Sequence, residues 1–430
     1  MIGIVVSTAD EASAHIGEML LEAADWEPVE AGVYRTDGFE LREFEEWHLE
    51  LDGVAAAFDD PDCIVFASRH SGETGRLLSA HFTGNFGEAE FGGHDRDLAT
   101  PCPGAHEQVL RALSENAPEG WDVAMECTHH GPTAVGAPSM FVELGSEEAQ
   151  WRDEEGARAV ARSILALDAD GAAPERTVVG FGGNHYAPRP TRLVTETDVA
   201  MGHVAADWSI EALGRPESHR DLIDTMFAAS GADLAVFDGD YPEVQSVVED
   251  LGYRIVSETW LRETDGIPMA LVDAVERELG PIDTGVVFGE RRVDPSSVTV
   301  RSLPDDAVAE CQTVDGDATR ALLEEHTVAY ETVENGNRIE GSAAFATDDD
   351  GERLVDGLVE ILEQAYDSVE RDDDVIVAER TAFDPAAARR AGVPEGPKFG
   401  RLAGGEPVAV DGETIRPENV QKRERQRFNV

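Results

Sequence analysis

The sequence predicts an α/β protein with a mixed, largely parallel sheet, helices on both of its faces, and a smaller C-terminal α+β extension. Two observations support this prediction. Through the first two thirds of the chain, short apolar runs typical of buried strands alternate with helical patterns, which is the order found in parallel sheets. From residue 300 onward the helices and strands follow a looser pattern of their own. We place the boundary near residue 295, which gives a first domain over residues 1–295 and an extension over residues 296–430.

Apolar runs and capping residues predict the first elements. The N-terminal run, residues 1–6, is the first strand, and Asp10 or Ser13 can cap a helix that continues to Glu22. A β-rich stretch covers residues 33–51, and the apolar residues 63–67 form a buried strand. A long loop rich in glycine and polar residues follows over 68–104, within which 73–80 is expected to be helical. Loops of this length are more often functional than idle.

The alternation continues through the first domain and changes in the extension. We expect helices over residues 106–116, 147–167, 198–212 and 220–230, and strands over residues 121–127, 177–181 and 234–238. In the extension, residues 354–366 form an amphipathic helix, because apolar side chains recur near helical spacing, and residues 375–377 form a short strand.

The chain is strongly acidic, with 88 aspartates and glutamates against 34 basic residues and a net charge of -54. Only two of the basic residues, Lys398 and Lys422, are lysines. Such a surface is typical of a halophilic cytoplasm, where molar salt screens charge repulsion to within about 3 Å. We therefore interpret the acidity as adaptation to salt. It does not exclude a nucleic-acid partner, because phosphate attraction is suppressed at high salt and binding must then depend on shape and short-range contacts.

Cysteine spacing and hydropathy set further limits. The four cysteines lie far apart and form no C-x-x-C pair, which argues against a thiolate zinc site or a disulfide framework. The N-terminal apolar run is too short for a signal peptide, and no stretch approaches the roughly 20 residues that a membrane span requires. We expect a soluble, cytoplasmic protein with reduced thiols and no membrane partner.

Histidines collect where predicted strands end, and this is the strongest functional signal in the sequence. His129 and His130 follow the strand over 121–127, His185 follows the strand over 177–181, and His70 follows the strand over 63–67. In open α/β sheets the carboxyl ends of the strands face the ligand crevice. The sequence therefore predicts an active site at this edge of the sheet, in an enzyme.

These residue types suit a hydrolytic zinc site. Three imidazole or carboxylate ligands with one open position are typical of such a site, and the ion can lower the pKa of bound water to about 7. Adjacent side chains on an extended backbone point to opposite sides, so we expect His129 and His130 to serve different roles or two different zinc ions. Glu143, in a strand-like segment, is a candidate metal ligand or general base.

Two other chemistries find little support. The segment Gly180-x-Gly182-Gly183 opens no predicted helix and lacks an acidic residue at the dinucleotide spacing, which argues against a nucleotide cofactor. The backbone N–H groups of Gly182 and Gly183 are better suited to hold an oxyanion or a phosphate. No G-x-S-x-G elbow is present to activate a serine.

Four segments together resemble the signatures of the archaeal and plant type of D-aminoacyl-tRNA deacylase. They are His-Phe-Thr-Gly-Asn-Phe-Gly at 81–87, Thr-His-His-Gly-Pro-Thr at 128–133, Phe-Val-Glu-Leu-Gly-Ser at 141–146 with Trp151 shortly after, and Gly-Phe-Gly-Gly-Asn-His-Tyr-Ala-Pro-Arg at 180–189. The resemblance extends from residue 1 to about residue 289, and the longer, acidic chain is similar to a haloarchaeal long form. It implies a zinc-dependent monomer with a phosphorylase/hydrolase-like fold. Such an enzyme cleaves the ester between a D-amino acid, typically D-tyrosine, and the terminal adenosine of tRNA by a zinc-activated water.

The resemblance makes the motif residues the candidates for the site. The catalytic candidates are His81, His129, His130 and Glu143. The metal candidates are His129, His130, His185 and His203, for one or two zinc ions. The substrate-binding candidates are Ser71, Thr83, Asn85, Gly182, Gly183 and Tyr186.

The extension carries a weaker resemblance. Residues 392–402 and 408–420 resemble a short piece of the tRNA 3′-end-processing endonuclease RNase Z, without that enzyme's histidine motif. This implies at most a shared tRNA-related module. Residues 422–427 are the only strongly basic run, which we expect to be a solvated terminus, with a phosphate-contacting tail as the alternative.

The motifs leave two other functions open. A zinc amidohydrolase or peptidase would cleave free D-amino-acid esters or amides as fast as charged tRNA. A non-catalytic tRNA-binding protein would retain tRNA with no metal bound and no deacylation.

Overall fold

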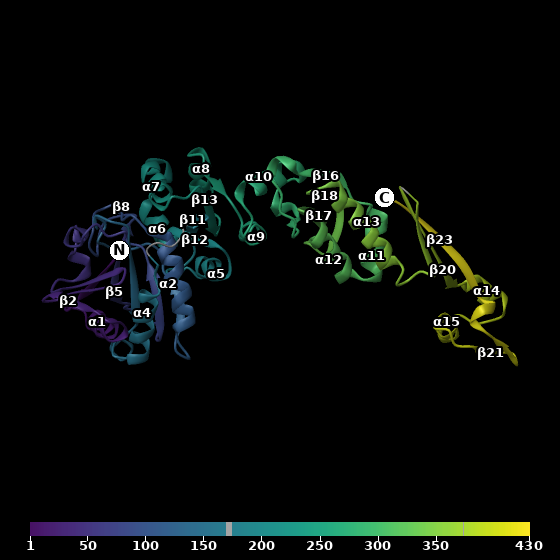
Figure 1. The fold of residues 1–430 in the computed structure, drawn as a ribbon, viewed down its shortest axis with the longest axis horizontal. Coiled ribbons are helices and arrows are strands. Elements are labelled where there is room, and N and C mark those ends of the chain that lie inside the picture. The colour runs from purple at the N-terminus through teal and green to yellow at the C-terminus, as the bar shows by residue number, and fades with distance from the viewer. Residues whose placement is uncertain (169–173, 373) are drawn as a thin grey trace. The chain divides into compact units, whose positions relative to one another are not determined.

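The computed structural model describes residues 1–168, 174–372 and 374–430 (Figure 1). The chain forms two compact units, Met1–Gly266 and Ile267–Val430. The predicted boundary near residue 295 lies inside the second unit, because strand β15 (Val286–Phe288) pairs with strand β17 (Ala329–Val333). That residues 1–295 carry catalysis and the remainder a separate role stays a prediction.

An eight-stranded sheet forms the centre of the first unit. Its strands are β1 (Ile2–Ser7), β2 (Glu27–Glu30), β3 (Val33–Thr36), β4 (Phe39–Phe44), β5 (Cys63–Arg69), β6 (Leu77–His81), β9 (Asp122–Met125) and β10 (Ser139–Gly145). Their order is β2-β3-β4-β1-β5-β10-β6-β9. Strands β4, β1, β5 and β10 run parallel, as do β6 and β9, whereas β6 is antiparallel to β10. The sheet is therefore mixed and largely parallel at its centre, as predicted.

Apolar layers cover both faces of this sheet. Helices α1 (Glu11–Ala23) and α4 (Glu154–Leu165) pack together and against β5 and β10 (Figure 1). On the other face, Leu51, Val54 and Phe58 pack against Ile64 and Phe66 of β5. Helix α1 begins where the sequence predicts, because the Asp10 carboxylate accepts hydrogen bonds from the N–H groups of residues 12 and 13. Helices α2 (Pro103–Asn116) and α3 (Glu148–Trp151) complete this part.

A second, wholly parallel sheet completes the first unit. Its strands are β11 (Arg176–Gly182), β12 (Val199–Ala205), β13 (Leu234–Asp238) and β14 (Arg254–Ile255), in the order β12-β11-β13-β14. Its helices are α5 (Pro188–Glu196), α6 (Asp207–Leu213), α7 (Arg220–Ser230), α8 (Pro242–Asp250) and α9 (Glu258–Glu263). Two backbone hydrogen bonds fasten the loop after β9 to this sheet, from Cys127 N–H to His185 O at 2.8 Å and from Thr128 N–H to Val204 O at 2.8 Å. Motifs from both sheets are thereby brought together.

One predicted helix of the first unit is wrong, and another is wrong in its first half only. Residues 77–80 of the predicted helix 73–80 belong to strand β6, which lies between β10 and β9. Residues 199–205 of the predicted helix 198–212 form strand β12, whereas residues 207–212 lie in helix α6, as predicted. Every residue of both strands is buried. A run buried on both faces shows no alternation, so periodicity cannot separate it from a buried helix. The predicted helix over 147–167 is interrupted at residues 152–153, between α3 and α4.

The second unit is an α+β structure, as predicted for the extension. One antiparallel sheet has the strand order β15-β17-β18-β16, in which β16 is Thr299–Ser302 and β18 is Arg338–Phe345. Another has the strand order β19-β20-β23, in which β19 is Ser368–Asp372, β20 is Val375–Phe383 and β23 is Gln421–Asn429. The remaining elements are α10 (Met269–Leu279), α11 (Asp305–Val314), α12 (Gly316–His326), α13 (Asp348–Leu362), α14 (Pro385–Arg390), α15 (Pro397–Ala403), β21 (Val408–Val410) and β22 (Glu413–Ile415).

The basic side chains of residues 422–427 are exposed to solvent, as expected, but the segment is a paired strand and not a loose terminus. It lies in strand β23, which pairs with β20 over its whole length, and Phe428 of the same strand is buried in the core of the unit. Arg423, Arg425 and Arg427 alternate with inward-facing residues and stay exposed. Within the part of the chain that the structure describes, no helix is long and apolar enough to cross a membrane.

Candidate active site

A cavity of about 420 Å³ opens where β5 and β10 carry polar residues. Its wall contains side chains from three of the four motifs, among them His129, His130, Glu143 and His185, together with His70 from the end of β5. The predicted convergence of strand-end histidines is therefore present in the structure. Residues that the sequence analysis did not propose for the site also line it, namely Asp10, Trp47, His48, Leu49, Arg69, Phe91 and Phe141.

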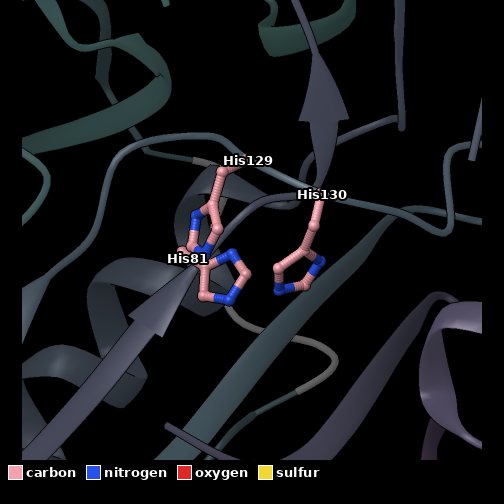
Figure 2. A group of neighbouring side chains, drawn as sticks. All are labelled: His81, His129 and His130. Atoms are coloured by element: carbon pink, nitrogen blue, oxygen red, sulfur yellow. The ribbon is translucent and has the colours of Figure 1, made fainter. Parts of the chain in front are cut away.

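His81, His129 and His130 form one group of imidazoles (Figure 2). One nitrogen of each ring lies within 4.8 Å of the others. The centroids of the His81 and His129 rings are 4.2 Å apart, and those of His129 and His130 are 4.4 Å apart. The expectation that adjacent His129 and His130 point to opposite sides is wrong, because His130 has a φ of 43° and the backbone turns there instead of staying extended.

Hydrogen bonds of the backbone fix this histidine loop. Gly84 N–H donates to His130 O at 2.8 Å, and the Thr83 hydroxyl donates to Pro132 O at 2.7 Å. His129 Nδ1 lies 2.8 Å from Cys127 O and His130 Nδ1 lies 2.7 Å from Gly131 O, so each ring can donate from Nδ1 and keep Nε2 as an acceptor. The loop thus presents two oriented imidazoles to the cavity.

Two buried carboxylates and His70 form the second group of the site. His70 Nδ1 is 3.0 Å from Glu126 Oε1 and 3.4 Å from Glu143 Oε2, and Glu126 Oε2 is 2.7 Å from His185 Nε2. Glu143 Oε1 is 3.6 Å from His81 Nε2, which links the two groups. Glu126 was missed by the sequence analysis, although a single carboxylate between Met125 and Cys127 in an apolar run was a usable signal.

Burial and ion pairing shift the pKa values of this group in a consistent way. Burial alone would lower the pKa of His70, but the Glu126 and Glu143 carboxylates outweigh it and raise that pKa to about 11. Burial alone would raise the pKa of Glu126, but hydrogen bonds from His185 and His70 hold it well below its usual range. Hydrogen bonds from His70 and His81 likewise lower the pKa of Glu143 against the effect of burial. These contacts favour the charged forms of His70 and of both glutamates.

His129 and His130 have the opposite character. Burial, followed by repulsion from His81, lowers the pKa of His129 well below its ordinary value and that of His130 to about 4. Both rings are thus neutral at neutral pH. Neutral imidazole is the form that ligates metals or accepts a proton.

The donor set fits a zinc ion. Among the described residues, three groups could hold a metal: His81 with His129 and His130, Cys127 with His129 and His185, and His70 with Glu126 and Glu143. In the part of the chain that the structure describes, the nearest carboxylate to the buried His81 Nε2 is Glu143, whose Oε1 is 3.6 Å away and too distant for a hydrogen bond. Unpaired buried acceptors are costly, and nitrogen and carboxylate oxygen are ligands that zinc accepts.

The predicted residues His203, Thr83 and Asn85 lie outside the metal groups. The two ring nitrogens of His203 contact Ala99 O at 3.0 Å and the Thr128 hydroxyl at 3.1 Å, so this fully buried ring supports the fold. Thr83 and Asn85 use their side chains to bind backbone carbonyls of neighbouring loops.

The other substrate-binding candidates divide between the cavity and the fold. Ser71 lines the cavity, and the Tyr186 hydroxyl lies 3.3 Å from His70 Nε2. Gly182 and Gly183 have positive φ values and lie against Asp238, where a Cβ on Gly182 would come within 2.4 Å of Asp238 O. Their glycine character therefore serves close packing of β11 on β13.

Comparison with known proteins identifies the family of this chain. The family model described as D-aminoacyl-tRNA deacylase matches residues 57–256. A D-aminoacyl-tRNA deacylase of Halobacterium salinarum is 52% identical over 432 residues, covering 100% of this chain and 95% of the relative, and one of Natronomonas pharaonis is 50% identical over 440 residues, covering all of both chains. The crystal structure of AF0625, described as a conserved protein of unknown function, superposes with a TM-score of 0.57 at 31% identity and covers 62% of this chain and 98% of that one. This chain belongs to the D-aminoacyl-tRNA deacylase family, which confirms the predicted family and class of enzyme.

Proposed function

We propose that this enzyme hydrolyses the ester bond of D-aminoacyl-tRNA, D-tyrosyl-tRNA among them, in the cavity lined by His70, His129, His130 and Glu143. One observation carries the proposal. In a member of the deacylase family, a buried network of Glu126, His70 and Glu143 meets neutral imidazoles at the sheet edge where ligands bind in open α/β folds. The combination of fixed charges and proton acceptors suits ester hydrolysis.

We further propose that one or two zinc ions are part of this site. His81, His129 and His130 would hold one ion, and Glu126 and His185, whose ligand atoms are 2.7 Å apart, offer ligands for another. A zinc ion bound there would polarise the ester carbonyl and lower the pKa of a water molecule.

Side chains of the protein can stabilise the negative charge that develops in the reaction and can transfer the proton. Cationic His70 places a positive charge at the cavity wall, where it stabilises negative charge that develops on the ester oxygen. The Glu143 carboxylate at the cavity wall can accept a proton from the attacking water and return it to the leaving ribose oxygen, since Nε2 of His129 and of His130 would be used to hold the ion. Discrimination against L-amino acids would come from a pocket wall placed where an L side chain must lie.

Release of tyrosine from D-Tyr-tRNA and from L-Tyr-tRNA, measured in molar KCl with and without a chelator, tests the proposal. We expect release from the D-ester alone and its loss after chelation, with recovery when zinc is returned. Equal release from both esters would contradict the stereochemistry. Release of tyrosine that a chelator does not reduce would contradict a role for a metal ion. Cleavage of free D-tyrosine esters as fast as charged tRNA would indicate a hydrolase of small substrates. Binding of tRNA without release of tyrosine would indicate a tRNA-binding protein.

A further inference from the structure

Two aromatic side chains at the cavity are left open to solvent. Large apolar side chains are rarely exposed among the described residues, yet Phe91 is 66% and Trp47 37% exposed, and both line the cavity of His129 and Glu143. Exposed aromatic rings beside a polar site are typical of ligand contacts. Neither ring is required by the metal groups described above.

The backbone beneath Phe91 is held firmly although its ring is exposed. Phe91 O accepts a hydrogen bond from Gly131 N–H at 2.9 Å, next to His130. The Asn85 side chain donates to Gly92 O at 3.0 Å, and Gly131 is packed so closely on this loop that a Cβ there would lie 2.2 Å from the Gly93 nitrogen. The loop that carries the imidazoles therefore also positions Phe91.

Trp47 is positioned by Arg69 and by contact with the loop that carries Phe91. The Arg69 guanidinium lies 4.6 Å from the centroid of the Trp47 ring and 5.0 Å from that of the Trp151 ring. Trp151 in turn donates from Nε1 to His70 O at 2.9 Å. The 3-10 turn His48–Glu50 follows Trp47, and a Cβ on Gly92 would lie 2.7 Å from Leu49 O, so the two aromatic loops are in contact.

A chain with a net charge of -54 must bind RNA through contacts other than electrostatic attraction of the phosphates. Its overall field repels phosphates, and molar salt weakens the attraction of any single basic residue. Stacking of a base on an aromatic ring acts at short range and does not depend on counterion release. Rings placed beside an ester-hydrolysing cavity supply such contacts at the nucleotide that carries the ester.

We infer that Phe91 and Trp47 form a stacking subsite for a purine nucleoside at the opening of the cavity. Its occupant is the terminal adenosine of the aminoacyl-tRNA, an identity that rests on the proposed function. The subsite positions the ribose so that the ester faces His129 and His130, while the rest of the tRNA stays outside.

Binding of the RNA trinucleotide CCA by the full-length protein, measured by calorimetry in molar KCl, tests the subsite. Alanine substitution at a base-stacking position typically weakens binding by roughly five- to 150-fold. We expect Phe91→Ala and Phe91→Leu to weaken CCA binding by at least about tenfold. Phe91→Tyr keeps an aromatic ring and should bind CCA about as tightly as the wild type. Leucine keeps the apolar bulk but has no aromatic face, so it separates stacking from hydrophobic contact. Trp47→Phe should bind better than Trp47→Ala for the same reason.

The kinetic consequence follows on D-Tyr-tRNA. The Phe91→Ala variant should raise KM by a similar factor and lower kcat much less, with an unchanged Tm because the side chain is exposed. Wild-type CCA affinity and KM in both alanine variants, or no CCA binding by the wild type, would overturn the subsite. CCA binding that depends on Phe91 in a protein that releases no D-amino acid would keep the subsite and overturn the proposed reaction.

Discussion

Glu126 is the residue on which the contacts of the site converge. Its carboxylate lies within 3.0 Å of His70 Nδ1, 2.7 Å of His185 Nε2 and 3.9 Å of His129 Nε2, and it is fully buried. A buried carboxylate persists only where cations or metals compensate its charge. Glu126 therefore sets the charge of its neighbours as well as their positions.

We predict that Glu126→Gln lowers kcat for D-Tyr-tRNA about 100-fold or more while KM changes little. The exchange keeps the shape of the side chain but removes the charge that raises the pKa of His70, so less positive charge remains at the cavity wall. Steady-state kinetics measures this, with the Tm as a check of folding. Glu107→Gln, at a carboxylate on helix α2, is the matched control and should retain activity. Wild-type kcat in Glu126→Gln would contradict the role of Glu126.

At the scale of elements, helix α2 packs a histidine into an apolar contact. His106 is fully buried, and its ring lies 4.6 Å from that of Phe82. Burial lowers its pKa from 6.5 to about 4. Above pH 6.5 both the folded and unfolded states are neutral at this residue. As the pH falls from 6.5 toward 4, only the unfolded state takes up the proton, so the free energy of unfolding decreases.

In the wild type, His106 lowers the free energy of unfolding by about 3 kcal/mol as the pH falls from 6.5 to 4. We predict that His106→Phe abolishes this decrease. The variant should be at least as stable as the wild type near pH 7 and clearly more stable at pH 4.5. Urea unfolding at several pH values measures the difference. His94→Phe, at a side chain that is 63% exposed, should change the pH dependence little. Parallel pH profiles of the wild type and His106→Phe would show that the buried ring is not the cause.

At the scale of the whole molecule, the net charge of -54 dominates. Many arginines form ion pairs with surface carboxylates, such as Arg192 with Glu258 and Arg371 with Glu352 and Asp356. Each of these arginines neutralises its own partner, so it does little to reduce the negative field of the other carboxylates. Repulsion among unpaired carboxylates opposes the compact state and is screened by salt.

We predict that the Tm falls by more than about 10 °C when KCl is lowered from molar concentration to about 0.1 M, where the screening length grows from about 3 to about 10 Å. Differential scanning calorimetry at a series of KCl concentrations measures this. NaCl should restore the Tm as well as KCl does, whereas sucrose, which does not screen charge, should restore much less. A Tm independent of salt would contradict the interpretation of the acidity as adaptation to salt.

Local signals in the sequence determined a large part of this protein. The cap at Asp10, the helix over Arg220–Ser230 and the strand over Leu234–Asp238 follow from capping, helical spacing and short apolar runs, and each occurs in the structure. The motifs at 81–87, 128–133, 141–146 and 180–189 indicated the family, and the histidines at strand ends indicated one cavity. These features could be predicted because residue type and spacing alone carry them.

The tertiary structure decided what depends on burial and on the path of the backbone. Strands β6 and β12 were predicted as helices because residues buried on both faces carry no periodic signal. The turn at His130 brings it and His129 to the same side, and pairing of the loop after β9 with the second sheet places His185 against Glu126. His203 lies apart because both of its ring nitrogens are bound within the fold. Which side chains of a motif meet, and which only support it, is fixed by contacts between segments far apart in the chain, and spacing along the sequence does not encode them.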